Sequence, residues 1–125
     1  MPEQVPRILI VEDEKPMARV LMHKFNAAGL ETVHIMSGDL VIPQLQSGHF
    51  DLVLLDLMIP EMDGFEVLQK VAELNLNIPI IVLSNLAQNE DIVKAKRLGA
   101  KDYLVKVRTT PADILEEVKK YLGSS

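Results

Sequence analysis

The chain has 125 residues, of which 48% are hydrophobic, and it carries a formal net charge of −5 and no cysteine. Such a composition fits one domain with its own core and excludes a disordered tail, a disulfide framework and a thiolate metal site. The acidic balance gives no electrostatic reason to bind nucleic acid. The apolar run from Ile8 to Val11 is too short for a signal peptide or a membrane span, so we expect a cytoplasmic protein that does not enter the membrane.

The first third of the chain predicts a strand, a helix and a second strand. The apolar run within residues 7–12 is continuous, which favours a strand buried on both faces. Apolar residues then recur every three to four positions, as on one face of a helix, and Gly29 can end that helix in the left-handed conformation. Residues 31–35 alternate, which indicates an edge strand with one more polar face. The helical stripe comprises Met17, Leu21, Phe25 and Ala28.

The middle third begins with the least regular segment. Residues 37–47 contain Pro43, so we expect a short or irregular helix there. Residues 51–56 include four consecutive apolar side chains and favour another fully buried strand. The next helical stripe comprises Phe65, Leu68, Val71 and Leu74.

The last third repeats the alternation. Residues 80–84 and 103–106 contain apolar runs that favour strands, and residues 90–98 favour a helix with Asn89 as its cap and Gly99 as its stop. The sequence from Thr110 to Asp113 resembles a capping box with proline at the first helical position. The final helical stripe comprises Ile114, Leu115, Val118 and Leu122.

Five strands that alternate with five helices predict a parallel sheet covered on both faces. The chain is too short for a closed barrel of strands and helices, which typically needs roughly 250 residues. An open doubly wound α/β sheet is therefore the expected fold. In such sheets the ligand site lies at the carboxyl ends of the strands.

Polar residues stand at four of the predicted strand ends. Two carboxylates about 4 Å apart repel each other by about 4 kcal/mol at an effective dielectric near 20, so a cluster of carboxylates needs cations. Lys106 is one such cation, and an oxygen-seeking ion such as Mg²⁺ is the natural second. No histidine stands at these ends, which argues against zinc or copper. Each residue alone is more often a turn or helix-cap residue, and only the joint pattern favours a site. The strand-end residues are Glu12, Asp13, Asp56, Ser84 and Lys106.

These residues, together with the spacing Asp56-x-x-x-Pro60-x-x-Asp63-Gly64, resemble the receiver domain of two-component response regulators. The resemblance extends from Arg7 to Leu122. It implies a single-domain, CheY-like receiver over residues 1–125, with a core of about 7–122 and a flexible tail at 123–125. The implied fold is the flavodoxin-like five-stranded sheet with strand order 2-1-3-4-5 and five flanking helices.

The resemblance also implies a role for each site residue. Asp56 is implied to be the phosphoacceptor, which becomes an aspartyl phosphate. Asp13, Asp56 and the backbone carbonyl of Met58 are implied to bind Mg²⁺, for which Mn²⁺ is a possible substitute, and Glu12 assists. Lys106 and Ser84 are implied to bind the phosphoryl oxygens, and Tyr103 resembles the aromatic residue that changes rotamer as Ser84 moves.

Three positions depart from the family pattern. Val107 stands where a proline with a cis peptide bond usually follows the lysine, and the cost of a non-proline cis bond, about 2.5–4 kcal/mol, favours a trans bond here. Asn85 replaces a small residue and is expected to crowd or hydrogen-bond the phosphoryl group. Met58 and Leu86 are apolar where the family tunes the access of hydrolytic water. We therefore hypothesise slow self-dephosphorylation.

The expected partners follow from the resemblance. They are a sensor histidine kinase or phosphotransfer protein as donor, and a protein target or a second copy of the chain as output. The output is expected to be a protein contact, because the chain ends after the fifth helix. The resemblance implies that the responsive surface consists of the fourth helix, fifth strand and fifth helix. If the chain is a fragment, other outputs, including DNA binding, remain open. Candidate residues on this surface are Lys94, Arg97, Tyr103 and Lys119.

Three other functions share this fold or its Asp nucleophile. A phosphohydrolase of the haloacid dehalogenase type needs a second Asp where Met58 stands. A flavodoxin-like FMN site needs a phosphate-binding loop after the first strand, where the run from Glu12 to Glu14 would repel phosphate. A pseudo-receiver that is never phosphorylated and acts as an interaction scaffold remains open. We do not expect an enzyme beyond the domain's own phosphoryl transfer and slow self-dephosphorylation.

Overall fold

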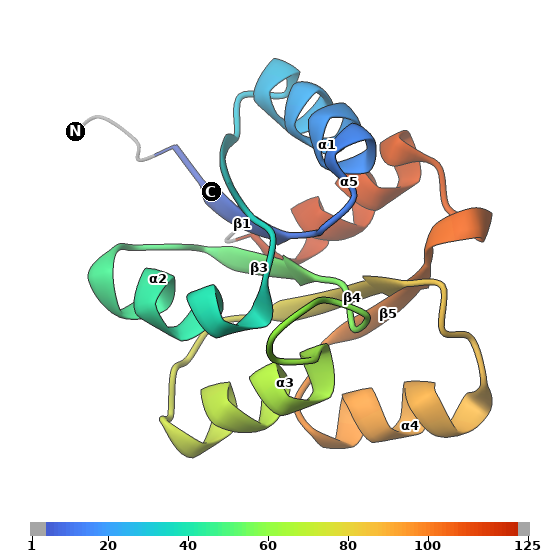
Figure 1. The fold of residues 1–125 in the computed structure, drawn as a ribbon. Helices are drawn as coiled ribbons and strands as arrows, with labels where there is room; N and C mark the ends of the chain where they lie inside the picture. The colour runs from blue at the N-terminus through green and yellow to red at the C-terminus, as the bar shows by residue number, and fades with distance from the viewer. Residues whose placement is uncertain (1–4, 123–125) are drawn as a thin grey trace.

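The computed structural model describes residues 5–122, so the expected flexible tail at 123–125 lies outside the described residues. Within this range the chain forms one parallel sheet, in the strand order β2-β1-β3-β4-β5 (Figure 1). The predicted fold class and strand order are therefore confirmed. The strands are β1 (Arg7–Val11), β2 (Glu31–Ile35), β3 (Leu52–Leu55), β4 (Ile80–Ser84) and β5 (Asp102–Val105).

The helices lie where the apolar stripes predict them. The segment 37–47 is irregular as expected, because the single 3₁₀ turn η1 (Gly38–Leu40) leads into a helix of two turns that begins at Val41 and includes Pro43. A second 3₁₀ turn, η2 (Lys106–Arg108), follows β5 directly. The α-helices are α1 (Lys15–Ala27), α2 (Val41–Ser47), α3 (Gly64–Glu73), α4 (Asn89–Arg97) and α5 (Pro111–Tyr121).

Most helix ends follow the local signals in the sequence. The Thr110 hydroxyl accepts a hydrogen bond from the Asp113 N–H at 3.1 Å, which confirms the predicted cap of α5. Gly29 and Gly99 adopt positive φ after α1 and α4, as their positions predict. The predicted cap of α4 is wrong by one residue. Asn89 is the first helical residue, and Gln88 holds the cap position without a side-chain hydrogen bond.

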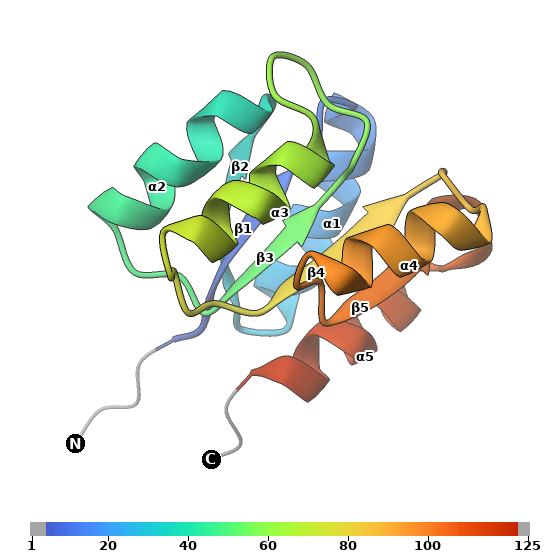
Figure 2. The same cartoon turned by 90° about the horizontal axis from the view of Figure 1, so that it is seen from below.

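The helices cover the sheet in two layers. Figure 1 shows α1 and α5 on one face, and Figure 2 shows α2, α3 and α4 side by side on the other. Side chains of β1, β3 and β4 alternate between these layers, because successive residues of a strand point to opposite faces. The layer with α1 and α5 includes Ile8, Ile10, Leu52, Leu54, Ile81 and Leu83, and the other includes Leu9, Val11, Val53, Leu55, Ile80 and Val82.

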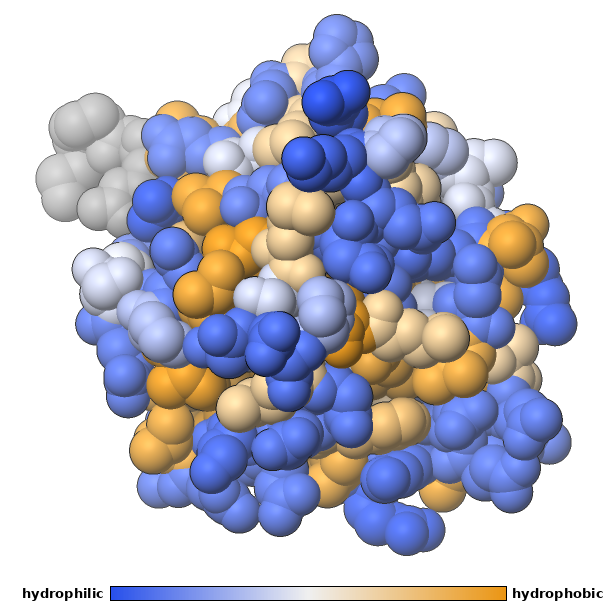
Figure 3. All heavy atoms as spheres, viewed as in Figure 1, coloured by the Kyte–Doolittle hydropathy of each residue, from blue (hydrophilic) through white to orange (hydrophobic). Residues whose placement is uncertain are grey.

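The surface is mostly polar, as expected when the apolar core lies between the sheet and its helices. In the view of Figure 3, hydrophilic residues predominate and the apolar ones form small groups between them. Among the described helices, none is long and apolar enough to cross a membrane.

Candidate functional site

The alternation along the strands decides which polar side chains meet beyond the sheet edge. Three residues that face α1 and α5 are each followed, two positions later, by an ionisable residue beyond the strand end, on the same face of the sheet. These pairs are Ile10 with Glu12, Leu54 with Asp56, and Leu104 with Lys106. Ser84 and Tyr103 belong to the opposite face, toward α4. The pleat of the sheet therefore brings Glu12, Asp56 and Lys106 together.

Lys106 is the centre of the cluster. Its Nζ lies 2.7 Å from Glu12 Oε1, 2.7 Å from Asp56 Oδ2 and 3.1 Å from Glu14 Oε1. The Lys106 side chain is only 8% exposed. Burial alone lowers the pKa of Lys106, but hydrogen bonds to Asp56 and Glu12 outweigh burial and raise that pKa above its ordinary value. Lys106 therefore stays charged and acts as the internal counter-ion of the carboxylates.

Glu12 is held by backbone contacts on both sides. Its N–H donates to the Ile35 carbonyl at 3.0 Å, and its carbonyl lies 2.6 Å from Nε2 of His34. The carboxylate oxygen Oε2 accepts the N–H of Glu14 at 3.0 Å. Burial raises the pKa of Glu12, and the hydrogen bonds from Lys106 and Glu14 oppose that rise.

Asp56 directly follows β3, and its side chain is buried. The backbone N–H of Asp56 donates to the Val11 carbonyl at 3.1 Å, which continues the pairing of β1 and β3. Its Oδ1 accepts the N–H of Met58 at 3.0 Å, while Oδ2 accepts Lys106. Each carboxylate oxygen can accept more than one bond, so Asp56 keeps capacity for a metal ion or a reacting group.

Three carboxylates at this site lie close enough together to hold a metal ion. One oxygen each of Glu12, Asp13 and Asp56 lies within 4.8 Å of the others. Asp13 is exposed, whereas the other two are buried. An all-oxygen ligand set suits Mg²⁺, and the single charge of Lys106 does not balance three carboxylates. The residues therefore fit a divalent cation.

The cluster opens into a pocket of about 300 Å³, lined by Asp13, Glu14, Asp56, Met58, Asn85 and Lys106. Met58 stands at its rim with 58% of its surface exposed. Leu86 and Ser84 are not among the lining residues. Leu86 instead packs against the core on the α2, α3 and α4 side. Of the two apolar positions expected to control water access, only Met58 lies at the pocket.

Ser84 and Tyr103 meet at the loop after β4. The Ser84 side chain is fully buried, and its Oγ accepts the N–H of Leu86 at 3.3 Å. The Tyr103 hydroxyl donates to the Leu86 carbonyl at 2.5 Å. Leu86, in the loop between Ser84 and α4, therefore links both side chains through its backbone.

Two side chains behave differently from the sequence-based expectation. Glu14 is not among the predicted site residues, yet its carboxylate reaches Lys106. The acidic run from Glu12 to Glu14 is the sequence signal that points to it. Asn85 Oδ1 accepts the N–H of Val107 at 3.1 Å, so its carbonyl oxygen is engaged with the backbone. Within residues 5–122 no peptide bond is cis, so the preference for a trans bond before Val107 is confirmed.

The expected output surface contains one residue with a different orientation. Lys94 of α4 places its Nζ 4.4 Å from the centre of the Phe65 ring on α3, so it faces α3 rather than β5. Arg97 is exposed, and Lys119 pairs with Glu116 at 3.5 Å on the surface of α5. An exposed pair of this kind contributes little to stability.

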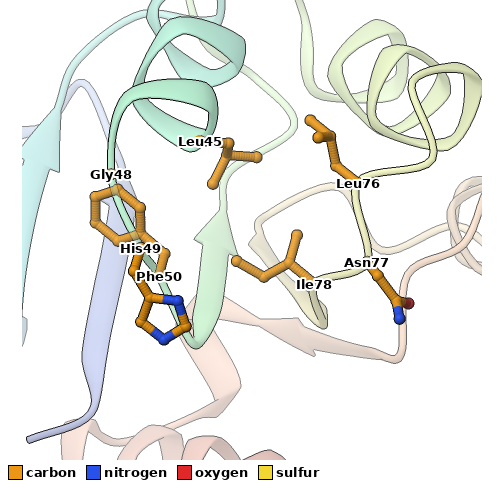
Figure 4. Close-up of a pocket in the computed structure, with 7 residues that line it drawn as sticks. All are labelled: Leu45, Gly48, His49, Phe50, Leu76, Asn77 and Ile78. Carbon is orange, nitrogen blue, oxygen red and sulfur yellow. The ribbon is translucent and has the colours of Figure 1, made fainter. Parts of the chain in front are cut away.

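A second pocket of about 150 Å³ lies at the opposite edge of the sheet, where β3 and β4 begin. Figure 4 shows Leu45, Leu76 and Ile78 around it, while the side chain of Asn77 points away. His49 nearby pairs with Asp51 at 3.0 Å. This pocket lacks the converging carboxylates of the first, so the candidate site is the cluster around Asp56.

Comparison with known proteins finds a match over almost the whole described chain. A family model described as the response regulator receiver domain matches residues 8–119. The chain is 39% identical to the transcriptional regulatory protein DltR of Streptococcus agalactiae, over 80% of this chain and 45% of that protein. It is 34% identical to the transcriptional regulatory protein BaeR of Escherichia coli, over 96% of this chain and 49% of that protein. The chain spans about half the length of these curated relatives.

Solved structures show the same likeness. The chemotaxis response regulator CheY4 of Vibrio cholerae superposes with a TM-score of 0.87 at 26% identity, over 95% of this chain and all of that chain. A CheY-like receiver domain protein of Methanospirillum hungatei gives a TM-score of 0.87 at 27% identity, over 94% of this chain and 93% of that chain. The likeness therefore extends over almost the whole described sheet with its helices.

Proposed function

The chain belongs to the response regulator receiver domain family, and on that premise we propose that it accepts a phosphoryl group on Asp56 from a sensor histidine kinase or a phosphotransfer protein. One observation carries the proposal. The Asp56 carboxylate is buried at a strand end, receives the Lys106 ammonium at 2.7 Å, and opens onto a pocket of about 300 Å³. A carboxylate in that position can reach a substrate in the pocket while Lys106 compensates its negative charge.

The reaction is a direct phosphoryl transfer. An Asp56 oxygen forms the bond to phosphorus while the bond from phosphorus to the donor's nitrogen or oxygen breaks, and that electron pair leaves with the donor atom. Protein groups contribute mainly by positioning and by meeting the charge on the phosphoryl oxygens. Lys106 is already at Asp56 and has only to exchange a carboxylate oxygen for a phosphoryl oxygen. Ser84 is proposed to donate its hydroxyl to a second phosphoryl oxygen.

Glu12, Asp13, Asp56 and the backbone carbonyl of Met58 are proposed to hold Mg²⁺, with Mn²⁺ as a substitute. When bound, the ion would neutralise part of the charge that develops on the transferring group. The three carboxylates support this role because their oxygens already converge within 4.8 Å.

Wild-type protein incubated with acetyl phosphate and Mg²⁺ is expected to gain one phosphoryl group, detected by intact-protein mass spectrometry. Asp56→Asn keeps the size of the side chain but removes the nucleophilic carboxylate, and it is expected to gain none. The same incubation with a chelator should also prevent the gain. A wild type that stays unmodified would leave the pseudo-receiver function, an interaction scaffold, in place of this proposal.

The proposed output is a change of the surface formed by α4, β5 and α5. Ser84 moves toward the phosphoryl group. Because Ser84 and Tyr103 both hydrogen-bond to the Leu86 backbone, this movement displaces Leu86 and breaks the bond from the Tyr103 hydroxyl to the Leu86 carbonyl. A protein target or a second copy of the chain would read the change, with Arg97, Tyr103 and Lys119 as contact residues. We propose that residues 5–122 make no contact with nucleic acid. We also propose that they form one receiver domain and that the protein is cytoplasmic, as expected from the sequence.

Met58→Asn is expected to shorten the lifetime of the phosphorylated form about tenfold, because a polar side chain at the pocket rim can hold the attacking water by a hydrogen bond of about 1.4 kcal/mol. Loss of the phosphoryl group would be followed by mass spectrometry after the donor is removed. Leu86→Asn should have a smaller effect, since Leu86 packs against the core and does not line the pocket. Leu74→Asn, at an exposed apolar residue that follows α3, serves as the control. An unchanged lifetime in Met58→Asn would refute this account of slow hydrolysis.

A further inference from the structure

The backbone directly after Lys106 offers an N–H donor that the turn itself does not satisfy. Lys106 begins the 3₁₀ turn η2, and the N–H groups at the start of such a turn have no acceptor within the turn. The peptide bond between Lys106 and Val107 is trans, and Val107 supplies an N–H that a proline at this position would lack. Val107 is 78% exposed, so packing does little to fix this part of the turn.

Asn85 provides the missing acceptor. Its Oδ1 accepts the Val107 N–H at 3.1 Å, across 22 residues of sequence. Asn85 directly follows Ser84, at the end of β4, where the strand is buried and well paired. The hydrogen bond therefore ties η2 to a rigid part of the sheet. A second bond, from Thr109 Oγ1 to the Val105 carbonyl at 2.8 Å, secures the far side of the turn.

Fixing this turn matters because lysine is a flexible residue. Holding its four-carbon side chain in one conformation costs about 2 kcal/mol of entropy, and a moving backbone would add to that cost. In this structure the Lys106 ammonium must reach Glu12 and Asp56 simultaneously, each at 2.7 Å. A site held in its working geometry needs supporting hydrogen bonds behind the residues that act.

We propose that Asn85 is a positioning residue for Lys106, which acts through the Asn85–Val107 hydrogen bond rather than by touching the phosphoryl group. The side-chain carbonyl of Asn85 holds the turn, and the turn holds the ammonium over Asp56. The consequence for phosphoryl transfer rests on the function proposed above. The placement of Lys106 itself does not rest on it.

The first test needs no phosphorylation. In wild-type protein the Val107 amide proton is expected to exchange slowly with solvent and the Lys106 ammonium to give a resolved ¹H–¹⁵N NMR signal. Asn85→Ala should speed the Val107 exchange and broaden or remove the Lys106 signal. Asn85→Asp keeps an oxygen acceptor at the same position and should restore both. Gln88→Ala changes an exposed amide residue of the same loop that makes no side-chain cap hydrogen bond, and it should leave both unchanged.

The second test separates positioning from direct contact. Asn85→Ala is expected to slow phosphorylation by acetyl phosphate about fivefold, the effect of one lost hydrogen bond. In a Lys106→Met background the same change should alter the rate less than about twofold, because the residue that Asn85 positions is gone.

Two results would overturn the proposal. One is a Val107 amide whose exchange does not respond to Asn85→Ala. The other is a full rate loss from Asn85→Ala that persists without Lys106, which would assign Asn85 a direct contact with the phosphoryl group. If the wild type accepts no phosphoryl group, the proposed function fails, while the NMR measurements still decide whether Asn85 positions Lys106.

Discussion

Replacing Lys106 with methionine is expected to lower the free energy of unfolding by about 3–5 kcal/mol at neutral pH in the absence of Mg²⁺. Methionine keeps most of the length and apolar surface of the lysine side chain but removes its charge. Glu12 and Asp56 are both buried, and they would lose the ammonium that lies 2.7 Å from each. Two carboxylates without a cation would then repel each other in a poorly solvated place.

The measurement is urea unfolding with and without Mg²⁺. Added Mg²⁺ should recover much of the loss, since the carboxylates of Glu12, Asp13 and Asp56 fit the ion. Lys120→Met is the matched control. Its ammonium also lies 2.7 Å from a carboxylate, that of Glu117, but this pair is on the surface and should matter little. Equal stability of wild type and Lys106→Met without Mg²⁺ would mean that Lys106 does not hold the cluster together.

The pH dependence of the same variant has a definite sign. Burial already raises the pKa of Glu12 in the wild type, and removing Lys106 takes away a group that lowers it. A carboxyl group with a raised pKa binds more protons in the folded state than in the unfolded state. The free energy of unfolding therefore falls as pH rises from the ordinary pKa to the raised one. The loss in Lys106→Met should therefore shrink as pH falls from the raised pKa of Glu12 toward its ordinary value of 4.5.

Gly38→Ala is expected to destabilise the protein by about 3 kcal/mol, at the upper end for added volume in a packed place. A Cβ on Gly38 would lie 1.8 Å from the carbonyl oxygen of Met62, which is backbone and cannot simply rotate away. The Gly38 N–H also donates to the Pro60 carbonyl at 3.1 Å. An alanine would push the 57–63 loop, which leads from Asp56 to α3, away from η1.

Chemical unfolding measures the loss, and the NMR shift of the Met58 amide reports whether the loop has moved at the site. Gly29→Ala is the comparison, because Gly29 has a φ of +88° but no atom within 4 Å of an added Cβ. It should cost about 1–2 kcal/mol from backbone strain alone and leave the Met58 amide unchanged. Similar losses for the two variants, with no shift of Met58 in either, would show that the contact between Gly38 and Met62 is loose.

The sequence predicts this fold well because its signals are local and agree with one another. The continuous apolar runs of the strands are easily distinguished from the three- to four-residue spacing of the helices. Gly29, Gly99 and Thr110 mark element ends by their own chemistry. The convergence of Glu12, Asp56 and Lys106 also follows from the sequence, since parallel strands end at one edge. Element ends are predicted less closely. α4 begins one residue earlier than expected, where Gln88 and Asn89 offer similar amide side chains, and β5 ends at Val105 because Lys106 begins η2.

The contacts that sequence could not supply are those between loops. The Asn85–Val107 hydrogen bond depends on the path of η2 beside the end of β4, and no periodic pattern encodes that path. The reach of Glu14 to Lys106 depends on how α1 begins. The turn of Lys94 toward Phe65 depends on the spacing of α3 and α4. Each is a distance between segments remote in sequence, which residue spacing along one segment does not determine.

The alternation of side chains along β3 makes the site sensitive to the count of residues as well as to their kind. A deletion or insertion of one residue within this strand would turn every later side chain to the other helical layer. Leu55 or Leu57 would then face Lys106, and Asp56 would point into the apolar layer with α3 and α4. The buried Asp56 charge would lose its Lys106 partner, and an apolar side chain would stand at the mouth of the pocket. Substitutions can tune this protein position by position, but its central strand tolerates no change of length.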